Sequence, residues 1–159
     1  MSSTIVLAAA EDVRSEDSVQ LMKELSEELG LLYGGDGTAG FQLSDVEVPR
    51  SAFIVARLDG YPVGCGAIRP LDENSVEVKR MYTRSDYRRK GVAQAILAEA
   101  ERLAIHFAYR NLKLQTGPLQ PEAAALYERM GYYRIPIFHG DWDQVLAYQK
   151  DLVQQPASL

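Results

Sequence analysis

A strand, a basic turn and a long helix follow one another in the middle of this sequence. Residues 76–83 alternate in character, with valines on one face and Glu77 and Lys79 on the other. Residues 91–108 carry an apolar stripe at helical spacing, formed by Val92, Ile96, Ala100, Leu103 and Phe107. Because a strand that leads closely into an amphipathic helix packs that helix onto a sheet, this segment predicts an α/β fold.

Strand and helix patterns continue on both sides of this unit. A helix is expected after Ser15, with Met22, Leu25, Leu29 and Leu32 on its apolar face, and a second one at 120–130. The glycine-rich segment 31–40 is interpreted as a mobile loop. Further strands are expected at 4–9, 52–58, 61–68, 112–116, 132–135 and 145–150, with a hairpin turn at Asp59-Gly60. The order predicts a mixed sheet with helices on both faces.

The length of 159 residues predicts one domain, residues 1–159, with a substantial core. Hydrophobic residues make up 47% and charged residues 25%, which excludes disordered and fibrous classes. No apolar run approaches the roughly 18 residues of a membrane span, so no membrane association is expected. The first residues carry no basic stretch typical of a secretory signal, and Cys65 is the only cysteine. We therefore expect a cytoplasmic protein without disulfides and without a metal site.

Charge is distributed unevenly along the chain. The net charge of −5 argues against a nucleic-acid partner. Residues 1–50 contain 3 basic and 10 acidic residues, whereas residues 76–93 contain six basic and two acidic ones. This concentration of positive charge in an acidic chain predicts that an anionic ligand binds near residues 76–93.

The turn Arg88-Arg89-Lys90-Gly91-Val92-Ala93 precedes the long helix. A helix N-terminus offers unpaired N–H groups and the positive end of a dipole, and small residues let a phosphate approach the backbone. The turn thus has the features of a pyrophosphate site, although a solvated basic loop would have the same composition. Two other phosphate-binding motifs are not matched. No Walker sequence occurs, and Arg69 stands where the dinucleotide-binding motif needs a third glycine after Gly64 and Gly66.

The chain resembles the GNAT superfamily of acyl-coenzyme A-dependent N-acyltransferases. The family signature is Arg or Gln, two residues, Gly, one residue, then Gly or Ala, and Arg88, Gly91 and Ala93 match it. Segments 77–83, 114–117 and 125–132 resemble the central strand, the next strand and the late helix with its tyrosine. The resemblance covers residues 5–152. It implies a twisted mixed sheet of six or seven strands with about four helices, and direct transfer of an acetyl group from acetyl-coenzyme A to a primary amine.

The resemblance also implies where the co-substrate binds. The strand residues Met81, Tyr82 and Thr83 would hold the pantetheine arm as if it were an added strand, with a bulge near Met81 aiming an N–H at the thioester oxygen. Ordinary strand pairing remains the alternative. The pyrophosphate would lie on Arg88, Arg89, Lys90, Gly91, Val92, Ala93 and Gln94. Arg84, Arg88, Arg89 and Lys90 are equal candidates for the ribose phosphate.

Catalytic roles are implied for two residues. Tyr127 would protonate the departing thiolate, unless it is only a core side chain. Glu77 would accept the amine proton, unless it forms a salt bridge with Lys79 or Arg80. His139, in a late loop, is a further candidate for the base or for a substrate contact. His106 is expected to be structural, and Cys65 to be buried and inert rather than an acyl-enzyme nucleophile.

The acceptor is a small-molecule or peptide amine whose identity the sequence leaves open. Acidic residues of the first fifty would suit a cationic acceptor or simply form a solvated face: Glu24, Glu27, Glu28, Asp36, Asp45 and Glu47. Two alternatives to an enzyme are a non-catalytic acyl-coenzyme A sensor and a module that docks a peptide at its sheet edge. An open edge strand near the C-terminus also makes a homodimer an expectation.

Overall fold

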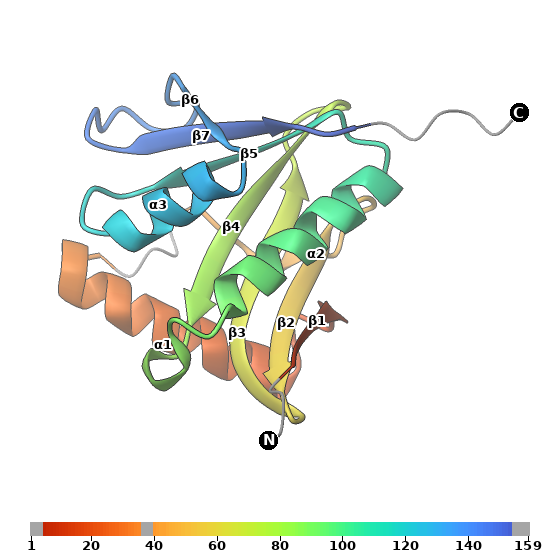
Figure 1. Ribbon diagram of the computed structural model, residues 1–159, viewed down its shortest axis with the longest axis vertical. Helices are drawn as coiled ribbons and strands as arrows, with labels where there is room; N and C mark the ends of the chain where they lie inside the picture. Colours follow the sequence, from red (N-terminus) through yellow and green to blue (C-terminus); the bar gives the residue numbers. More distant parts are fainter. Residues whose placement is uncertain (1–4, 36–39, 154–159) are drawn as a thin grey trace, which may run out of the picture.

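The computed structural model describes residues 5–35 and 40–153, which form one seven-stranded mixed sheet with helices on both faces (Figure 1). The strand order is β1-β2-β3-β4-β5-β7-β6. The strands are β1 (Val6–Glu11), β2 (Ala52–Leu58), β3 (Tyr61–Pro70), β4 (Ser75–Thr83), β5 (Asn111–Thr116), β6 (Tyr133–Ile135) and β7 (Leu146–Asp151). The α-helices are α1 (Glu16–Tyr33), α2 (Val92–His106) and α3 (Pro121–Arg129), and the 3-10 helices are η1 (Leu43–Val46) and η2 (Ser85–Tyr87).

Two hydrophobic clusters hold the layers together, one on each face of the sheet. The larger cluster packs α2 and Tyr127 of α3 against Val76 and Val78 of β4 and against the inner residues of β2 and β5. The smaller cluster packs α1, through Leu21 and Met22, against Phe53 and Val55 of β2. Since burial of apolar area is the main favourable term in folding, the covering of both faces fixes the sheet between its helices, as the sequence predicted.

The first helix confirms its predicted start and corrects its predicted end. Ser15 is the N-cap, and its Oγ accepts a hydrogen bond from the backbone N–H of Ser18 at 3.1 Å. The helix runs to Tyr33 before Gly34 ends it in the left-handed conformation, so residues 31–33 do not belong to a loop. The remainder of the predicted loop includes residues 36–39, which lie outside the described residues.

The other elements differ from prediction mainly at their ends. The first strand covers Val6–Glu11 rather than 4–9, and its predicted start, Thr4, lies outside the described residues. The β2 strand has the predicted bounds, and Asp59 and Gly60 both adopt positive φ in the predicted hairpin turn. The described residues contain three α-helices where about four helices were expected.

The central strands β4 and β5 separate part of the way along the sheet. They pair in parallel from Ser75 and Asn111 to Val78 and Leu114, and the ladder stops there. Beyond that point β4 continues to Thr83, where it remains paired only with β3 in the ladders of the described strands. One edge of residues 79–83 is therefore available to another extended chain.

Candidate active site

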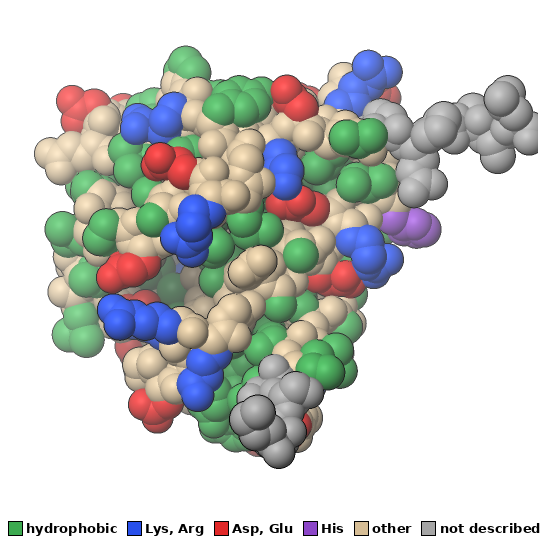
Figure 2. Space-filling model, viewed as in Figure 1, with side chains coloured by type: hydrophobic (Ala, Val, Ile, Leu, Met, Phe, Trp, Pro, Cys, Tyr) green, Lys and Arg blue, Asp and Glu red, His purple; other side chains and the backbone are tan. Residues whose placement is uncertain are grey.

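A cavity of about 920 Å³ opens where β4 and β5 separate. Its walls come from α1, β4, the start of α2, the end of β5 and α3. In the space-filling view, Lys and Arg side chains border a hollow between the start of α2 and α3 (Figure 2). Nearly all sequence-predicted site residues line this cavity: Met81, Tyr82, Thr83, Arg88, Arg89, Gly91, Val92, Ala93, Gln94 and Tyr127. Lys90, which is exposed, and Glu77 are not among its described lining residues.

The backbone of β4 bends beside this cavity. The register between β3 and β4 shifts between Cys65 and Ala67, and Arg80 on β4 has a φ of 56°. A non-glycine residue in this conformation costs of order 1–3 kcal/mol and persists where the surroundings hold it. The Arg80 side chain is buried and donates hydrogen bonds to the carbonyl of Met22 at 2.9 Å and to Ser26 Oγ at 2.7 Å, both on α1. The bulge expected near Met81 is therefore present and is fastened to α1.

Close packing beneath the bend explains a glycine of β3. A methyl group added at Gly66 would lie 2.7 Å from Ile96 Cγ2 on α2 and 2.9 Å from Met81 Sδ. Only a residue without a side chain lets α2 and the bulge approach β3 this closely. Gly66, which belongs to the incomplete dinucleotide motif of the sequence, thus allows the close packing that holds the bulge near Met81 against α2.

The basic turn forms the entrance to α2. Gly91 is the N-cap and has a φ of 81°, a conformation that glycine adopts without strain. Arg88 donates to the carbonyl of Thr83 at 3.1 Å and forms an ion pair with Glu28 of α1. Since the first N–H groups of α2 have no partner within the helix, the turn and the helix end together can bind a phosphate group.

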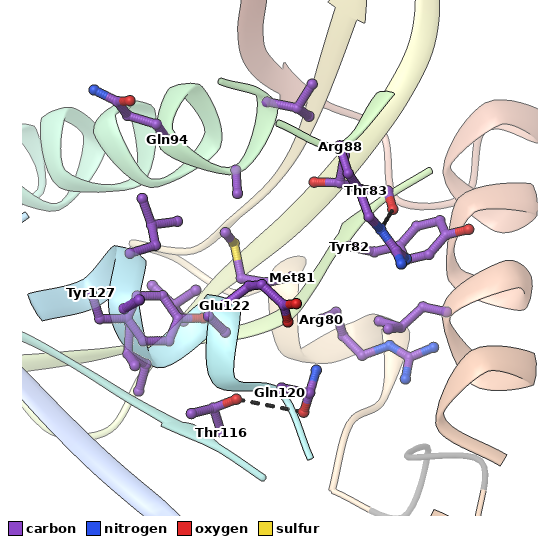
Figure 3. Close-up of a pocket in the computed structure, with 18 of the residues that line it drawn as sticks. Arg80, Met81, Tyr82, Thr83, Arg88, Gln94, Thr116, Gln120, Glu122 and Tyr127 are labelled. Carbon is purple, nitrogen blue, oxygen red and sulfur yellow. Dashed lines mark hydrogen bonds between the residues drawn. The ribbon is translucent and has the colours of Figure 1, made fainter. Parts of the chain in front are cut away.

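Tyr127 projects from α3 into the cavity, on the opposite side from Met81 of β4 (Figure 3). Its residue surface is 5% exposed, and its ring packs against Tyr132 and Tyr148 with centroids 6.0 and 5.8 Å away. Burial raises the pKa of the Tyr127 hydroxyl to about 12, so the hydroxyl keeps its proton at neutral pH. The side chain is both a core residue and a cavity residue.

Glu77 and His139, the two candidate bases, contact each other. Nε2 of His139 lies 3.0 Å from Oε1 of Glu77. The alternative considered for Glu77 was a salt bridge with Lys79 or Arg80, but the ion-pair partner of the carboxylate is Arg69, whose Nε lies 3.1 Å away. Arg69 lies on the neighbouring β3 strand, directly across from Glu77 in the antiparallel ladder.

Several acidic residues of the first fifty bind arginines. Glu24 accepts two hydrogen bonds from Arg84, Glu47 binds Arg14, and Asp45 binds Arg69. Arg84, one candidate for the ribose phosphate, is held by Glu24 and by the carbonyl of Pro62. Most of the acidic residues that would suit a cationic acceptor or form a solvated face are therefore neutralised by ion pairs, while Asp36 lies outside the described residues.

Several lining residues escaped the sequence prediction. The sequence predicted only an apolar helix face for Leu25, Leu29 and Leu32, and all three line the cavity. Thr116 and Gln120, whose side chains lie 3.5 Å apart, form another wall (Figure 3). No local motif marks these positions, because only the separation of β4 and β5 exposes them to the cavity.

The described residues contain neither a cluster that could hold a metal ion nor a helix that could cross a membrane. No group of three or more His, Cys, Asp or Glu residues is arranged to hold a metal ion in the described part of the chain. Within the same residues, every helix is too short or too polar to cross a membrane.

The mixed sheet whose central strands part beside a basic helix N-terminus is the fold of solved structures of acyl-CoA N-acyltransferases. The model of the acetyltransferase (GNAT) family matches residues 17–132, and this chain belongs to that family as an N-acetyltransferase.

Named relatives agree with this assignment, and a solved structure shares the fold. An IAA acetyltransferase from Azospirillum brasilense is 34% identical over 128 residues, covering 80% of this chain and 84% of its own. An N-acetylaspartate synthetase from Xenopus tropicalis is 36% identical over 101 residues, or 60% of this chain and 37% of its own. A GNAT family acetyltransferase from Elizabethkingia anophelis with acetyl-CoA bound has a TM-score of 0.68 at 15% identity, covering 92% of this chain and 98% of that one.

Proposed function

We propose that this enzyme transfers the acetyl group of acetyl-coenzyme A to a primary amine by direct attack within a ternary complex. One observation carries the proposal: a single cavity joins the N-terminus of α2, the free edge of β4 and the hydroxyl-bearing ring of Tyr127. The structural neighbour with acetyl-CoA bound supports the choice of co-substrate. The relative named N-acetylaspartate synthetase supports an amine acceptor.

The co-substrate would lie along the cavity with its two ends on different elements. Its pyrophosphate would bind the N–H groups of Val92, Ala93 and Gln94 together with Arg88 and Arg89. Its pantetheine arm would hydrogen-bond to the backbone of Met81 and Thr83 as an added strand. A phosphate at the turn would compete with Glu28 for the guanidinium of Arg88. Lys90 is exposed and would contribute charge at the rim.

The chemistry would use the bulge and Tyr127. When the neutral amine attacks the thioester carbon, an N–C bond forms and negative charge develops on the carbonyl oxygen. A backbone N–H at the bulge, near Met81, would stabilise that charge. As the C–S bond breaks, the Tyr127 hydroxyl would donate its proton to the thiolate and would regain one, by way of water, from the nitrogen of the new amide. On the acceptor face, Glu77 and its partner His139 would supply the base.

We propose that the acceptor reaches the site from the sheet face opposite α2. Glu77 and Lys79 lie on that face, away from the valines that pack against α2. Because most acidic side chains there are paired with arginines, charge attraction for a polycation is not part of the proposal. The single buried Cys65 suits a reducing compartment, so we include a cytoplasmic location. Pairing of two chains through the short edge strand β6 is proposed for a homodimer.

Thiol release measured against a panel of amines tests the proposed function. We expect calorimetric binding of acetyl-coenzyme A and amine-dependent release of free thiol with at least one primary amine. Binding without release for any acceptor would instead support the acyl-coenzyme A sensor. Absence of binding would favour the peptide-docking alternative and contradict both other functions.

A further inference from the structure

The two candidate bases, Glu77 and His139, contact each other, but their side chains differ greatly in solvent exposure. The side chain of Glu77 is 3% exposed, whereas that of His139, 3.0 Å away, is 43% exposed. Glu77 is therefore shielded from any acceptor, while the imidazole ring is accessible from outside. A group that takes a proton from a bound amine must be within hydrogen-bond reach of it. Of the two, only His139 is exposed enough to come within such reach of an acceptor without a rearrangement of the sheet.

A chain of charged groups holds Glu77 in place. Asp45 Oδ2 lies 2.6 Å from Arg69 Nη1, and Arg69 Nε lies 3.1 Å from Glu77 Oε1. Arg69 also donates to the carbonyl of Gly40 at 2.7 Å. The carboxylate is thus fixed by residues of β3 and η1, so it can orient a partner more precisely than a free side chain could.

The backbone of His139 is fixed independently, by Gln115 of β5. The Gln115 side chain accepts from the N–H groups of Phe138 at 2.8 Å and His139 at 3.1 Å, and it donates to the carbonyl of His139 at 3.2 Å. Gln115 itself lines the cavity, as does Val78, the residue after Glu77. The pair therefore lies beside the point where β4 and β5 separate, on the acceptor face.

The contact with Glu77 also selects the tautomer of the ring. A carboxylate accepts hydrogen bonds, so Nε2 carries the proton that points to Glu77. In the neutral ring this leaves Nδ1 with a free lone pair. A base needs such a lone pair directed away from the group that orients it.

We propose that His139 is the catalytic base, with Nδ1 as the proton acceptor, and that Glu77 is a positioning residue that acts through it. This assignment rests on the proposed function. The acceptor enters as an ammonium ion, and Nδ1 removes one proton from its nitrogen. The resulting lone pair forms the N–C bond while the C–S bond breaks. The exposed imidazolium then releases its proton to water. Charged groups around the Glu77–His139 pair are Glu77 and Lys79 on β4, Arg69 on β3, Asp45 on η1 and Lys113 on β5, whose Nζ lies 5.9 Å from the Phe138 ring centre.

Kinetics of His139→Ala, with the chain's other histidine as the control, test the assignment. We expect kcat/KM for the acceptor to fall at least about 100-fold in His139→Ala, the usual lower range for loss of a general base. The acidic limb of the pH profile should disappear, and added imidazole should restore part of the rate. His106→Ala, at the end of α2 beside Phe107, should keep the rate and the profile. An unchanged rate and profile in His139→Ala would overturn the proposal.

Glu77→Gln separates positioning from direct proton transfer. We expect about a 10-fold loss of kcat/KM with the acidic limb retained, because the ring remains but its orientation weakens. Loss of the acidic limb in Glu77→Gln, with the limb retained in His139→Ala, would assign the base to Glu77 instead. Thermal unfolding of each variant shows whether a lost rate reflects lost folding.

Nitrogen-15 NMR of the unaltered protein gives a readout that does not depend on activity. We expect the neutral His139 ring to be protonated at Nε2, and a ring protonated at Nδ1 would contradict the proposal. Failure of the proposed function would appear differently, as no thiol release from the unaltered protein with any amine.

Discussion

The carboxylate of Glu24 binds the guanidinium of Arg84 through both of its oxygens, with Nε and Nη2 of Arg84 each 2.9 Å away. This bidentate pair joins α1 to the residue that follows β4, ahead of η2 and the basic turn. Arg84 also donates to the carbonyl of Pro62 at 2.8 Å and lies over the ring of Tyr61. One ion pair thus connects the acidic first helix with the entrance to the co-substrate site.

Removal of the Glu24–Arg84 ion pair should lower the free energy of unfolding more at neutral pH than at acidic pH. The hydrogen bond from Arg84 lowers the pKa of Glu24, so the pair stabilises the fold above the ordinary carboxyl pKa near 4.5 and loses its effect as pH falls through the lower folded value. We expect Glu24→Gln to lose about 1 kcal/mol at pH 7 in urea unfolding and less at pH 3. An equal loss at both pH values would contradict an ionic contribution.

Tyr127→Phe should reduce turnover without weakening co-substrate binding. Since the raised pKa, about 12, keeps the hydroxyl protonated, we expect kcat to fall by about 10- to 100-fold across pH 6–9. Tyr148→Phe is the matched control, because its ring is equally buried and lies 5.8 Å from that of Tyr127 but is not a described lining residue. Unchanged turnover in Tyr127→Phe would remove the acid role.

Arg88→Ala should weaken acetyl-coenzyme A binding. A charge-assisted hydrogen bond to phosphate contributes about 1.5–3 kcal/mol, so we expect the calorimetric Kd to rise about 10- to 100-fold. Arg102→Ala is the control, because Arg102 lies farther along α2 and pairs with Glu99 on the surface. Equal affinities for both variants would place the phosphates elsewhere.

Gly66→Ala should damage both stability and the site. The added methyl group would overlap Ile96 and Met81, and such overpacking costs about 1–3 kcal/mol. Urea unfolding and turnover measure the two effects. Gly35→Ala, where a methyl group would meet nothing within 4 Å, should unfold at nearly the same urea concentration as the unaltered protein. A Gly66→Ala protein as stable as that control would show that α2 can shift away from β3.

Cys65 should be inert in the folded protein. Burial raises the pKa of its thiol to about 12, and the thiolate is the reactive form. We expect no labelling by a maleimide at pH 7.5 and complete labelling in denaturant. Acetylated Cys65 should also not accumulate when acetyl-coenzyme A is present without an acceptor, and its accumulation would contradict direct transfer.

The sequence predicted the strands, the α3 helix and the basic turn well, because each of these leaves a local pattern, whereas the roles of the candidate site residues stay predictions. The alternation in residues 76–83 and the Pro121 and Gly131 signals around α3 are examples. Contacts across the sheet leave no such pattern. The ion pair of Glu77 with Arg69 and the contact with His139 join residues 8 and 62 positions apart. The antiparallel register of β3 with β4, and the loop ahead of β7, decide those partners.

The end of α1 is a second feature that the local sequence did not predict. Gly34 and Gly35 predicted an early end, but Tyr33 still belongs to the helix. Its hydroxyl accepts from the N–H of Leu119 at 3.1 Å and lies 3.2 Å from Gln120 Oε1. Tertiary contacts with the segment before α3 therefore extend the helix beyond what its local sequence favours.

The side chain of Arg80 binds α1, while its backbone forms the bend of β4. The first helix of this enzyme therefore cannot be exchanged without affecting the bend of β4. In a chimaera that takes α1 from a relative to alter acceptor preference, different residues would contact Arg80 and hold the bend. Engineering of specificity through this helix has to preserve the Arg80 contacts at Met22 and Ser26, or redesign the helix and the strand together.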